Sequence, residues 1–231
     1  MSQIQCRVGE ISPLTQVVYK VELIPAEPMS FRAGQYILVH MGENDKRPFS
    51  IANAGFDDQR IELHIGADEK NAYATEVLTR MRETGEISIS GGHGEAFLQS
   101  NGLPIILIAG GTGFSYTYSI LQQALHDHPH TPVALYWGGR HQDDLYLFDE
   151  LTALAARHQN FSFIPVVEFA HDDWTGRTGW VHHAVLADYP TLADNQVYIA
   201  GRFEMAKAAR DDFNARGIAP ENLFGDAYAF I

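Results

Sequence analysis

The sequence has 231 residues, of which 45% are hydrophobic, and its formal net charge is −13. This length and composition suit one large or two small folded domains and exclude a disordered chain. The negative charge disfavours nucleic acid and anionic lipid as partners, because both are repelled at long range. The single cysteine, Cys6, excludes an internal disulfide and any all-cysteine metal or iron–sulfur site.

The sequence shows neither an expected membrane span nor a signal-peptide pattern. No apolar run reaches the roughly 18 residues that a membrane span needs. The opening residues, MSQIQCRVGE, lack the basic start and the apolar stretch of a signal peptide. We therefore expect a soluble cytoplasmic protein with no membrane partner.

The first hundred residues consist of short β-rich segments separated by turn signals. One helical segment interrupts them, at residues 71–82, with Ala74, Val77, Leu78 and Met81 at helical spacing. This pattern predicts a small antiparallel sheet or barrel. The expected strands lie within residues 16–23, 35–41, 47–53, 60–66 and 86–91.

After residue 100 the chain alternates between apolar strands and helices. Continuous apolar strands between helices indicate a parallel sheet that is covered on both faces. We expect this sheet to have five strands. The clearest strand segments are 104–110, 133–139, 161–167 and 196–201, and the helical segments are 115–127, 147–158 and 204–216. The sequence therefore predicts two domains, a β domain over 1–100 and an α/β domain over 101–231.

A glycine-rich turn, GGTG, follows the first of these apolar strands and opens a helix. Such a turn presents free backbone amides and the positive end of a helix dipole to an anionic ligand. It departs from the dinucleotide fingerprint G-x-G-x-x-G, because Tyr116 stands where the third glycine belongs. On its own the turn indicates either a nucleotide site or merely a tight connection between strand and helix.

Two further strands end in glycine followed by arginine, at Gly139–Arg140 and Gly201–Arg202. The carboxyl ends of parallel strands form the edge where open α/β folds bind ligands. Arginine suits a phosphate group, and here it supplies local positive charge to an acidic chain. The alternative for each arginine is an ordinary surface ion pair.

Taken in order, the motifs FRAGQY, DKRPFS, LIAGGTGFSY, LYWGGR, GRFEMAK and GDAYAF resemble the ferredoxin–NADP reductase superfamily over essentially the whole chain. The resemblance is strongest to bacterial NAD(P)H–flavin oxidoreductases, including the luciferase-associated type. It implies a flavin-binding β-barrel followed by a domain that binds NADH or NADPH. It further implies hydride transfer from nicotinamide C4 to flavin N5, with release of reduced FMN, riboflavin or FAD.

The same resemblance implies roles for the flavin-side residues. In RPFS, Arg47 faces the flavin side chain or its phosphate, whereas Pro48 and Phe49 line the ring. Ser50 hydrogen-bonds near flavin N5, although a plain strand hydroxyl is the alternative. A further segment lies along another part of the ring and consists of His64, Ile65 and Gly66.

On the nucleotide side, the GGTG turn is expected to hold the nicotinamide end of NAD(P)H. With Ser50, Thr112 is the residue expected to take part in hydride transfer. Tyr228 either covers the flavin face or packs in the core, and no metal is expected. The full set of implied nucleotide contacts is Gly110, Gly111, Thr112, Gly113, Ser115, Tyr116, Arg140, Gly201, Arg202, Asp226 and Tyr228.

The sequence departs from relatives that retain flavin permanently, which carry a Gly-x-x-Ser/Thr turn at the first helix. Here the turn reads NAYA, so Asn71 replaces the glycine and Ala74 the hydroxyl residue. Asp68 and Glu69, just upstream, compete with a phosphate at this helix end. We therefore expect flavin to be an exchangeable substrate. A second departure is Ala200, which stands where many relatives have a cysteine.

Three functions are compatible with these motifs. The favoured one is a free-flavin reductase that supplies reduced flavin to a monooxygenase, a luciferase or ferric iron. The alternatives are an electron-transfer module with bound flavin and a non-catalytic nucleotide-binding domain. The preference for NADH or NADPH stays open, since Asp143 and Asp144 lie close to Arg140. The histidine-rich segments at 126–130 and 182–183 are interpreted as solvated surface.

Overall fold

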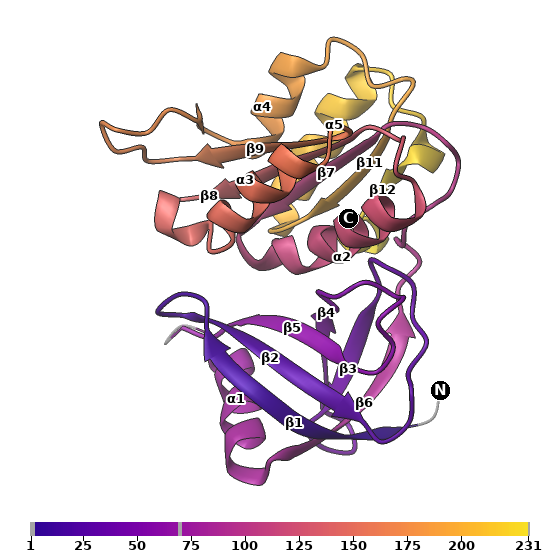
Figure 1. Ribbon diagram of the computed structural model, residues 1–231, viewed down its shortest axis with the longest axis vertical. Coiled ribbons are helices and arrows are strands. Elements are labelled where there is room, and N and C mark those ends of the chain that lie inside the picture. Colours follow the sequence, from indigo (N-terminus) through magenta and orange to yellow (C-terminus); the bar gives the residue numbers. More distant parts are fainter. Residues whose placement is uncertain (1–2, 69–70, 231) are drawn as a thin grey trace.

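The computed structural model describes residues 3–68 and 71–230, so the expectation for Glu69 lies outside the described residues. The chain forms two layers of sheet, one above the other along its long axis (Figure 1). The first is an antiparallel sheet with the strand order β4-β3-β6-β1-β2-β5. Its strands are β1 (Ile4–Pro13), β2 (Val18–Pro25), β3 (Tyr36–His40), β4 (Lys46–Ser50), β5 (Ile61–Gly66) and β6 (Glu86–His93).

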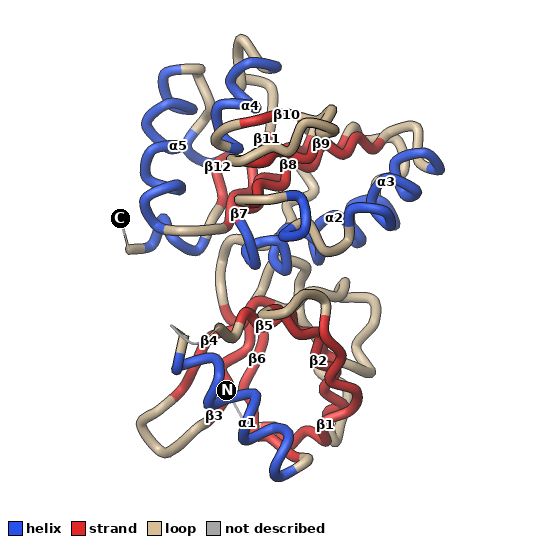
Figure 2. The backbone as a smooth tube through the Cα atoms, turned by 90° about the vertical axis from the view of Figure 1, so that its left-hand side faces the viewer, coloured by secondary structure: helices blue, strands red, loops and turns tan. Residues whose placement is uncertain are grey.

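The two edge strands of this sheet come together and close it as a barrel, as expected. Just after β4, the amide of Ala52 donates to the Glu62 carbonyl over 2.8 Å. The amide of Glu62 in turn donates to the side chain of Asn53 over 2.8 Å. Figure 2 shows the strands curving around a common interior.

The predicted first helix is α1 (Ala72–Thr84), which lies against β5 and β6 of the barrel. Asn71 caps its start by accepting a hydrogen bond from the Ala74 amide, over 3.2 Å. It ends at Gly85, whose φ of +67° suits glycine. All four apolar residues predicted to face inward are buried: Ala74, Val77, Leu78 and Met81.

The second sheet is entirely parallel, with the order β10-β9-β8-β7-β11-β12. It has six strands where we expected five, because each edge carries a strand of only two residues. Pairs of that length leave no periodic signal in the sequence. The strands are β7 (Ile105–Gly110), β8 (Val133–Gly139), β9 (Phe161–Val167), β10 (Arg177–Thr178), β11 (Gln196–Ala200) and β12 (Leu223–Phe224).

Helices cover both faces of the parallel sheet, as its continuous apolar strands predicted. Alternate residues of β7 point to opposite faces, so Leu107 packs with α2 and Ile108 packs with α4 and α5. The face with α2 and α3 looks toward the barrel (Figure 1). The helices are α2 (Phe114–Asp127), α3 (Phe148–Arg157), α4 (Val181–Asp188) and α5 (Phe203–Ala215), and short 3-10 turns span Gly111–Gly113, Gln142–Asp144, Pro220–Asn222 and Asp226–Ala229.

The first sheet ends at His93 and the second begins at Ile105, with an irregular segment between them. A domain boundary at residue 100 falls inside that segment and stays a prediction. Within the described part of the chain, no helix has both the length and the apolar character needed to cross a bilayer.

Candidate functional site

Helix α2 joins the parallel sheet to the barrel side of the molecule through buried and half-buried side chains. The Ser119 hydroxyl donates to the carbonyl of Asn53 over 2.7 Å, and the Gln122 amide donates to the carbonyl of Ala52 over 2.8 Å. The hydroxyl of Tyr116 donates to the Ala96 carbonyl over 2.6 Å. These contacts fix how the carboxyl edge of the parallel sheet faces the barrel.

The expected flavin strand and the glycine turn meet at this junction. A Cβ atom added at Gly66, the last residue of β5, would lie 3.1 Å from Thr112 Cγ2. Thr112 is exposed, and so is Gly111 beside it. The fold therefore brings together two segments that the sequence could only place separately, one from each sheet.

The glycines of the turn have different reasons to be glycine. A Cβ at Gly110 would lie 2.9 Å from Met205 Sδ, and one at Gly113 would lie 2.5 Å from the Ala200 carbonyl oxygen. Close packing therefore requires glycine at both positions, at the end of β7 against α5 and in the turn against the end of β11. Gly111 has a φ of +54° with open space around its missing side chain, so the backbone there is accessible to a ligand.

Arg47 of β4 is buried among its own partners. Its guanidinium donates to Asp45 over 2.9 and 2.6 Å, to Glu76 of α1 over 2.7 Å and to the Tyr73 carbonyl over 2.6 Å. The hydrogen bonds to Asp45 and Glu76 raise the pKa of Arg47, and its bond to Asp45 lowers the pKa of that carboxyl. The arginine expected to meet a flavin phosphate is already neutralised by two carboxylates.

The rest of β4 presents side chains at the edge of the barrel. Pro48 is exposed, whereas Phe49 and Ser50 are half-buried. Ser50 is paired in the ladder with Tyr36 of β3. Three residues of the predicted flavin segment thus lie on accessible strand, and the fourth, Arg47, is turned into the ion pairs described above.

Asp226 joins this corner from the far end of the chain. A Cβ at Gly94 would lie 3.1 Å from Asp226 Oδ1 and 3.1 Å from the ring of Tyr36. Burial raises the pKa of Asp226 to about 6. Asp226 and Tyr36, the ladder partner of Ser50, thus both lie beside Gly94, which places a carboxyl with a raised pKa near the barrel edge.

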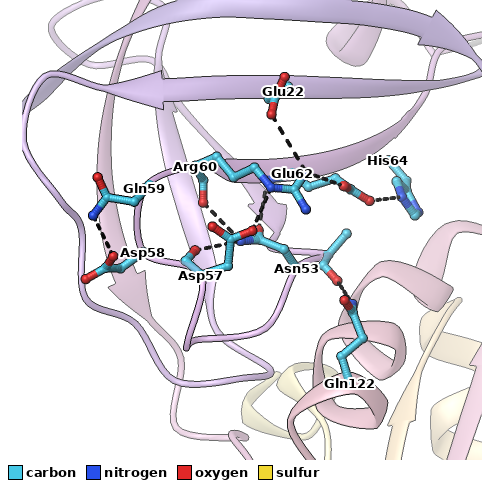
Figure 3. Close-up of polar contacts among 10 residues, drawn as sticks. Glu22, Asn53, Asp57, Asp58, Gln59, Arg60, Glu62, His64 and Gln122 are labelled. Atoms are coloured by element: carbon cyan, nitrogen blue, oxygen red, sulfur yellow. Dashed lines mark hydrogen bonds and ion pairs between the residues drawn. The ribbon is translucent and has the colours of Figure 1, made fainter. Parts of the chain in front are cut away.

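His64 is fully buried, so its ring is not available to a ligand. Its Nε2 lies 3.0 Å from Glu62 Oε1, and its Nδ1 lies 3.2 Å from the hydroxyl of Tyr146 (Figure 3 shows the Glu62 side of this network). A neutral imidazole satisfies both partners when Nε2–H donates and Nδ1 accepts. Burial raises the pKa of Glu62, but the hydrogen bond from His64 and the positive charges of Arg60 and Lys20 outweigh this effect and lower the pKa overall.

Sequence reasoning missed the aromatic cluster that covers His64 from the second sheet. Phe114 stacks on Trp137 with centroids 3.8 Å apart, and Tyr146 meets Trp137 edge-on at 4.9 Å. Tyr118 stacks on Phe114 at 5.0 Å. The sequence shows polar residues at alternate positions, Arg60 just before β5 and Glu62 and His64 within it, but this pattern is also typical of a solvated face and so did not indicate an aromatic cover.

The remaining predicted residues fall into two groups. Arg140 and Arg202 are exposed at the carboxyl edge of the parallel sheet, where the prediction put them. The amides of Arg140 and His141 both donate to Asp144 over 2.9 Å, so this carboxylate occupies the backbone donors there. The second group was predicted to contact a ligand but is buried in the core. It consists of the side chains of Ile65, Ser115 and Tyr116, together with the hydroxyl of Tyr228.

The burial of Tyr116 favours packing over ligand contact, because its only polar atom is bound to the Ala96 carbonyl. Ser115 differs, since its hydroxyl has no hydrogen-bond partner among the described residues. Gly201, with a φ of +156°, lies against Met205 and Gly110 rather than in open space. The accessible part of the site therefore reduces to the β4 edge, Gly66, the Gly111–Thr112 turn and the strand-end arginines.

Comparison with known proteins places these features in context. Residues 107–211 match the model of the oxidoreductase NAD-binding domain. The chain is 49% identical to the NAD(P)H-flavin reductase of Aliivibrio fischeri, over 99% of both chains. It is 48% identical to that of Vibrio harveyi, again over 99% of both chains.

Solved structures agree on the fold. The Amycolatopsis cytochrome P450 reductase GcoB superposes with a TM-score of 0.87 at 27% identity, covering 97% of this chain and 69% of that one. A ferredoxin NADP+ reductase from Neisseria gonorrhoeae superposes with a TM-score of 0.80 at 17% identity, covering 97% and 98%. At 17% identity, the similarity to the Neisseria gonorrhoeae structure shows only that the two-sheet fold is shared.

Proposed function

The chain belongs to the NAD(P)H-flavin reductases of the ferredoxin–NADP reductase superfamily, and from this premise we propose that it takes flavin as an exchangeable substrate at the junction of its two sheets. The enzyme reduces free flavin at the expense of NADH or NADPH. Bound together, nicotinamide and flavin supply the hydride donor and acceptor. The chain's own task is to hold the two rings against each other.

The observation that carries the exchange proposal is the ion-paired state of Arg47. A phosphate would have to displace Asp45 and Glu76, which hold the guanidinium at 2.6 and 2.7 Å. The start of α1 does not offer a phosphate its usual partners either. Asn71 accepts a hydrogen bond from the Ala74 amide and donates one to the Gly66 carbonyl. The described residues therefore suit the flavin ring better than a flavin phosphate.

The ring itself has suitable surroundings. Pro48, Phe49 and Ser50 offer an accessible strand edge on which a flat ring can lie. We assign Ser50 the hydrogen bond near flavin N5, because a hydroxyl can both donate and accept as the protonation of that atom changes. His64 and Ile65 are assigned a supporting role behind this surface.

We assign the nicotinamide end of the nucleotide to Gly111 and Thr112, which are exposed opposite Gly66. Arg140 and Arg202 extend the site along the carboxyl edge of the sheet and provide positive charge for the phosphates. Asp144 binds the amides at the end of β8. Binding of the 2′-phosphate of NADPH would therefore depend on the side chain of Arg140.

Release of reduced flavin implies a consumer, for which we propose a monooxygenase, a luciferase or ferric iron. The competing function is an electron-transfer module with permanently bound flavin. The saturated Arg47 favours release, because retaining FMN or FAD needs an anchor for the phosphate.

The deciding experiment compares flavin binding with turnover. The purified protein is desalted, its visible spectrum is recorded, and oxidation of NADH and NADPH is followed with and without riboflavin. We expect a colourless protein that turns over only when flavin is added, with riboflavin bound as tightly as FMN. A yellow protein with one flavin per chain would support the electron-transfer module instead.

A further inference from the structure

Two adjacent histidines and a carboxylate meet where helix α4 packs against helix α5 (Figures 1 and 2). One donor atom from each of His182, His183 and Asp212 lies within 4.8 Å of the others. His182 Nε2 is 3.8 Å from Asp212 Oδ2, and the two imidazole rings are 4.3 Å apart between centroids. The expectation that both histidines are solvated surface is wrong for His182, which the two helices bury.

The burial of His182 leaves one of its nitrogens without a partner. The residue is 3% exposed, and among the described residues nothing hydrogen-bonds its Nδ1. A buried polar atom of this kind is costly unless something pairs with it. The other nitrogen, Nε2, faces the Asp212 carboxylate at 3.8 Å, which is longer than a hydrogen bond.

The chemistry of the three groups narrows the ligand to a metal ion. Two imidazoles and one carboxylate form a set found at zinc and other first-row transition metals, with water completing the coordination. Around a tetrahedral zinc ion the donor atoms lie roughly 3.3 Å apart, given bonds of about 2.0–2.2 Å. The observed separations reach that spacing by side-chain rotation of His183 and Asp212, both of which are partly or fully exposed.

We propose that His182, His183 and Asp212 form a binding site for a divalent transition metal of the zinc class, which clips α4 to α5. The site adjoins the nucleotide edge of the sheet, because a Cβ at Gly138 of β8 would lie 2.9 Å from Val181 Cβ, at the start of α4. A bound ion thus restrains the helix that supports the end of β8. This site is independent of the proposed flavin chemistry.

The test is a zinc titration of the full, untagged chain after removal of metals with a chelator. Wild-type protein should bind one zinc ion per chain at micromolar or lower concentration, and an excess of zinc should raise the melting temperature by several degrees. His183→Asn, at an exposed position, and Asp212→Asn, at a half-buried one, should each weaken binding about tenfold or more. The matched control is His126→Asn with His130→Asn, which removes exposed histidines from another segment and should leave binding unchanged.

A second readout uses Trp180, whose ring lies 5.9 Å from that of His182 and 5.3 Å from that of His183. Cobalt or nickel at the site should quench the emission of Trp180, and Trp180→Phe should abolish the change without preventing zinc binding. The proposal is overturned if His183→Asn and Asp212→Asn bind zinc as the wild type does. It is equally overturned if binding disappears only in the His126→Asn, His130→Asn control, or if quenching persists in Trp180→Phe.

Discussion

Arg47 and Glu76 form an ion pair of 2.7 Å that joins strand β4 to helix α1. Asp45 holds the same guanidinium nitrogen at 2.6 Å, and the arginine side chain is 9% exposed. Charge-assisted bonds to an arginine are among the strong ones in proteins. The arginine that the resemblance assigns to flavin is therefore engaged in holding helix α1 against the barrel.

The first prediction concerns the choice among flavins. Replacing both carboxylates, as Asp45→Asn with Glu76→Gln, should free Arg47 to meet the phosphate of FMN. We expect the KM for FMN to fall by about 10-fold, which corresponds to one charge-assisted hydrogen bond. The KM for riboflavin, which has no phosphate, should stay within about twofold. Steady-state assays with the two flavins measure the ratio directly.

The control for this variant is Glu83→Gln, which removes an exposed carboxylate from the same helix. If Glu83→Gln improved FMN as much as the double variant did, general relief of negative charge would explain the effect. In that case Arg47 would have no part in selecting flavin.

The second prediction addresses the reacting centre. Ser50→Ala should lower kcat for flavin reduction by about 10- to 100-fold, as expected when one well-placed hydrogen bond to the reacting atoms is lost. Thr112→Val should act on the nucleotide side and raise the KM for NADH. Ser12→Ala, in strand β1, is the matched control. Unchanged kinetics in both Ser50→Ala and Thr112→Val would refute the assignment of the site.

The third prediction concerns the contact between barrel and parallel sheet. Tyr146→Phe removes the hydroxyl that meets His64 Nδ1 and keeps the ring that packs on Trp137. The loss of one buried hydrogen bond should cost about 1 kcal/mol and lower the melting temperature by about 2–4 °C. Tyr19→Phe, on β2, should cause no comparable change. An equal loss in the two variants would show that the His64 contact contributes nothing specific.

The sequence predicted the architecture well because both sheets have strong periodic signals. The inward-facing positions of α1 follow from the helical spacing of its apolar residues. Strand 104–110 follows from its continuous apolar run, which is typical of a strand buried on both faces. Strand β1 and helix α4 were not among the predicted segments. The two-residue strands β10 and β12 also escaped prediction, since their pairing depends only on the neighbours that the fold supplies.

The assignment of the site residues stays a prediction, and the sequence carries no information on how those residues are partnered in the fold. Motifs place Arg47 and His64 near flavin, yet they cannot reveal that Glu76, twenty-nine residues further on, pairs with the first. Nor can they reveal that Tyr146 covers the second. Both partners lie far away in sequence and carry no local pattern, so only the folded chain brings them to the site.

The last prediction uses the buried carboxyl of Asp226, whose pKa burial raises to about 6. Below the ordinary aspartate pKa, near 4, this group is protonated in both states and has no effect on stability. As the pH rises from about 4 to about 6, the unfolded chain ionises first, so the folded protein loses stability and stays less stable above that range. Asp226→Asn removes this cost. The variant's stability relative to wild type should therefore increase by about 1–2 kcal/mol between pH 4.5 and pH 7.5, measured by urea unfolding. Asp143→Asn, at an exposed position, should show no such trend. A difference between Asp226→Asn and wild type that is independent of pH would mean that Asp226 ionises normally in the folded chain.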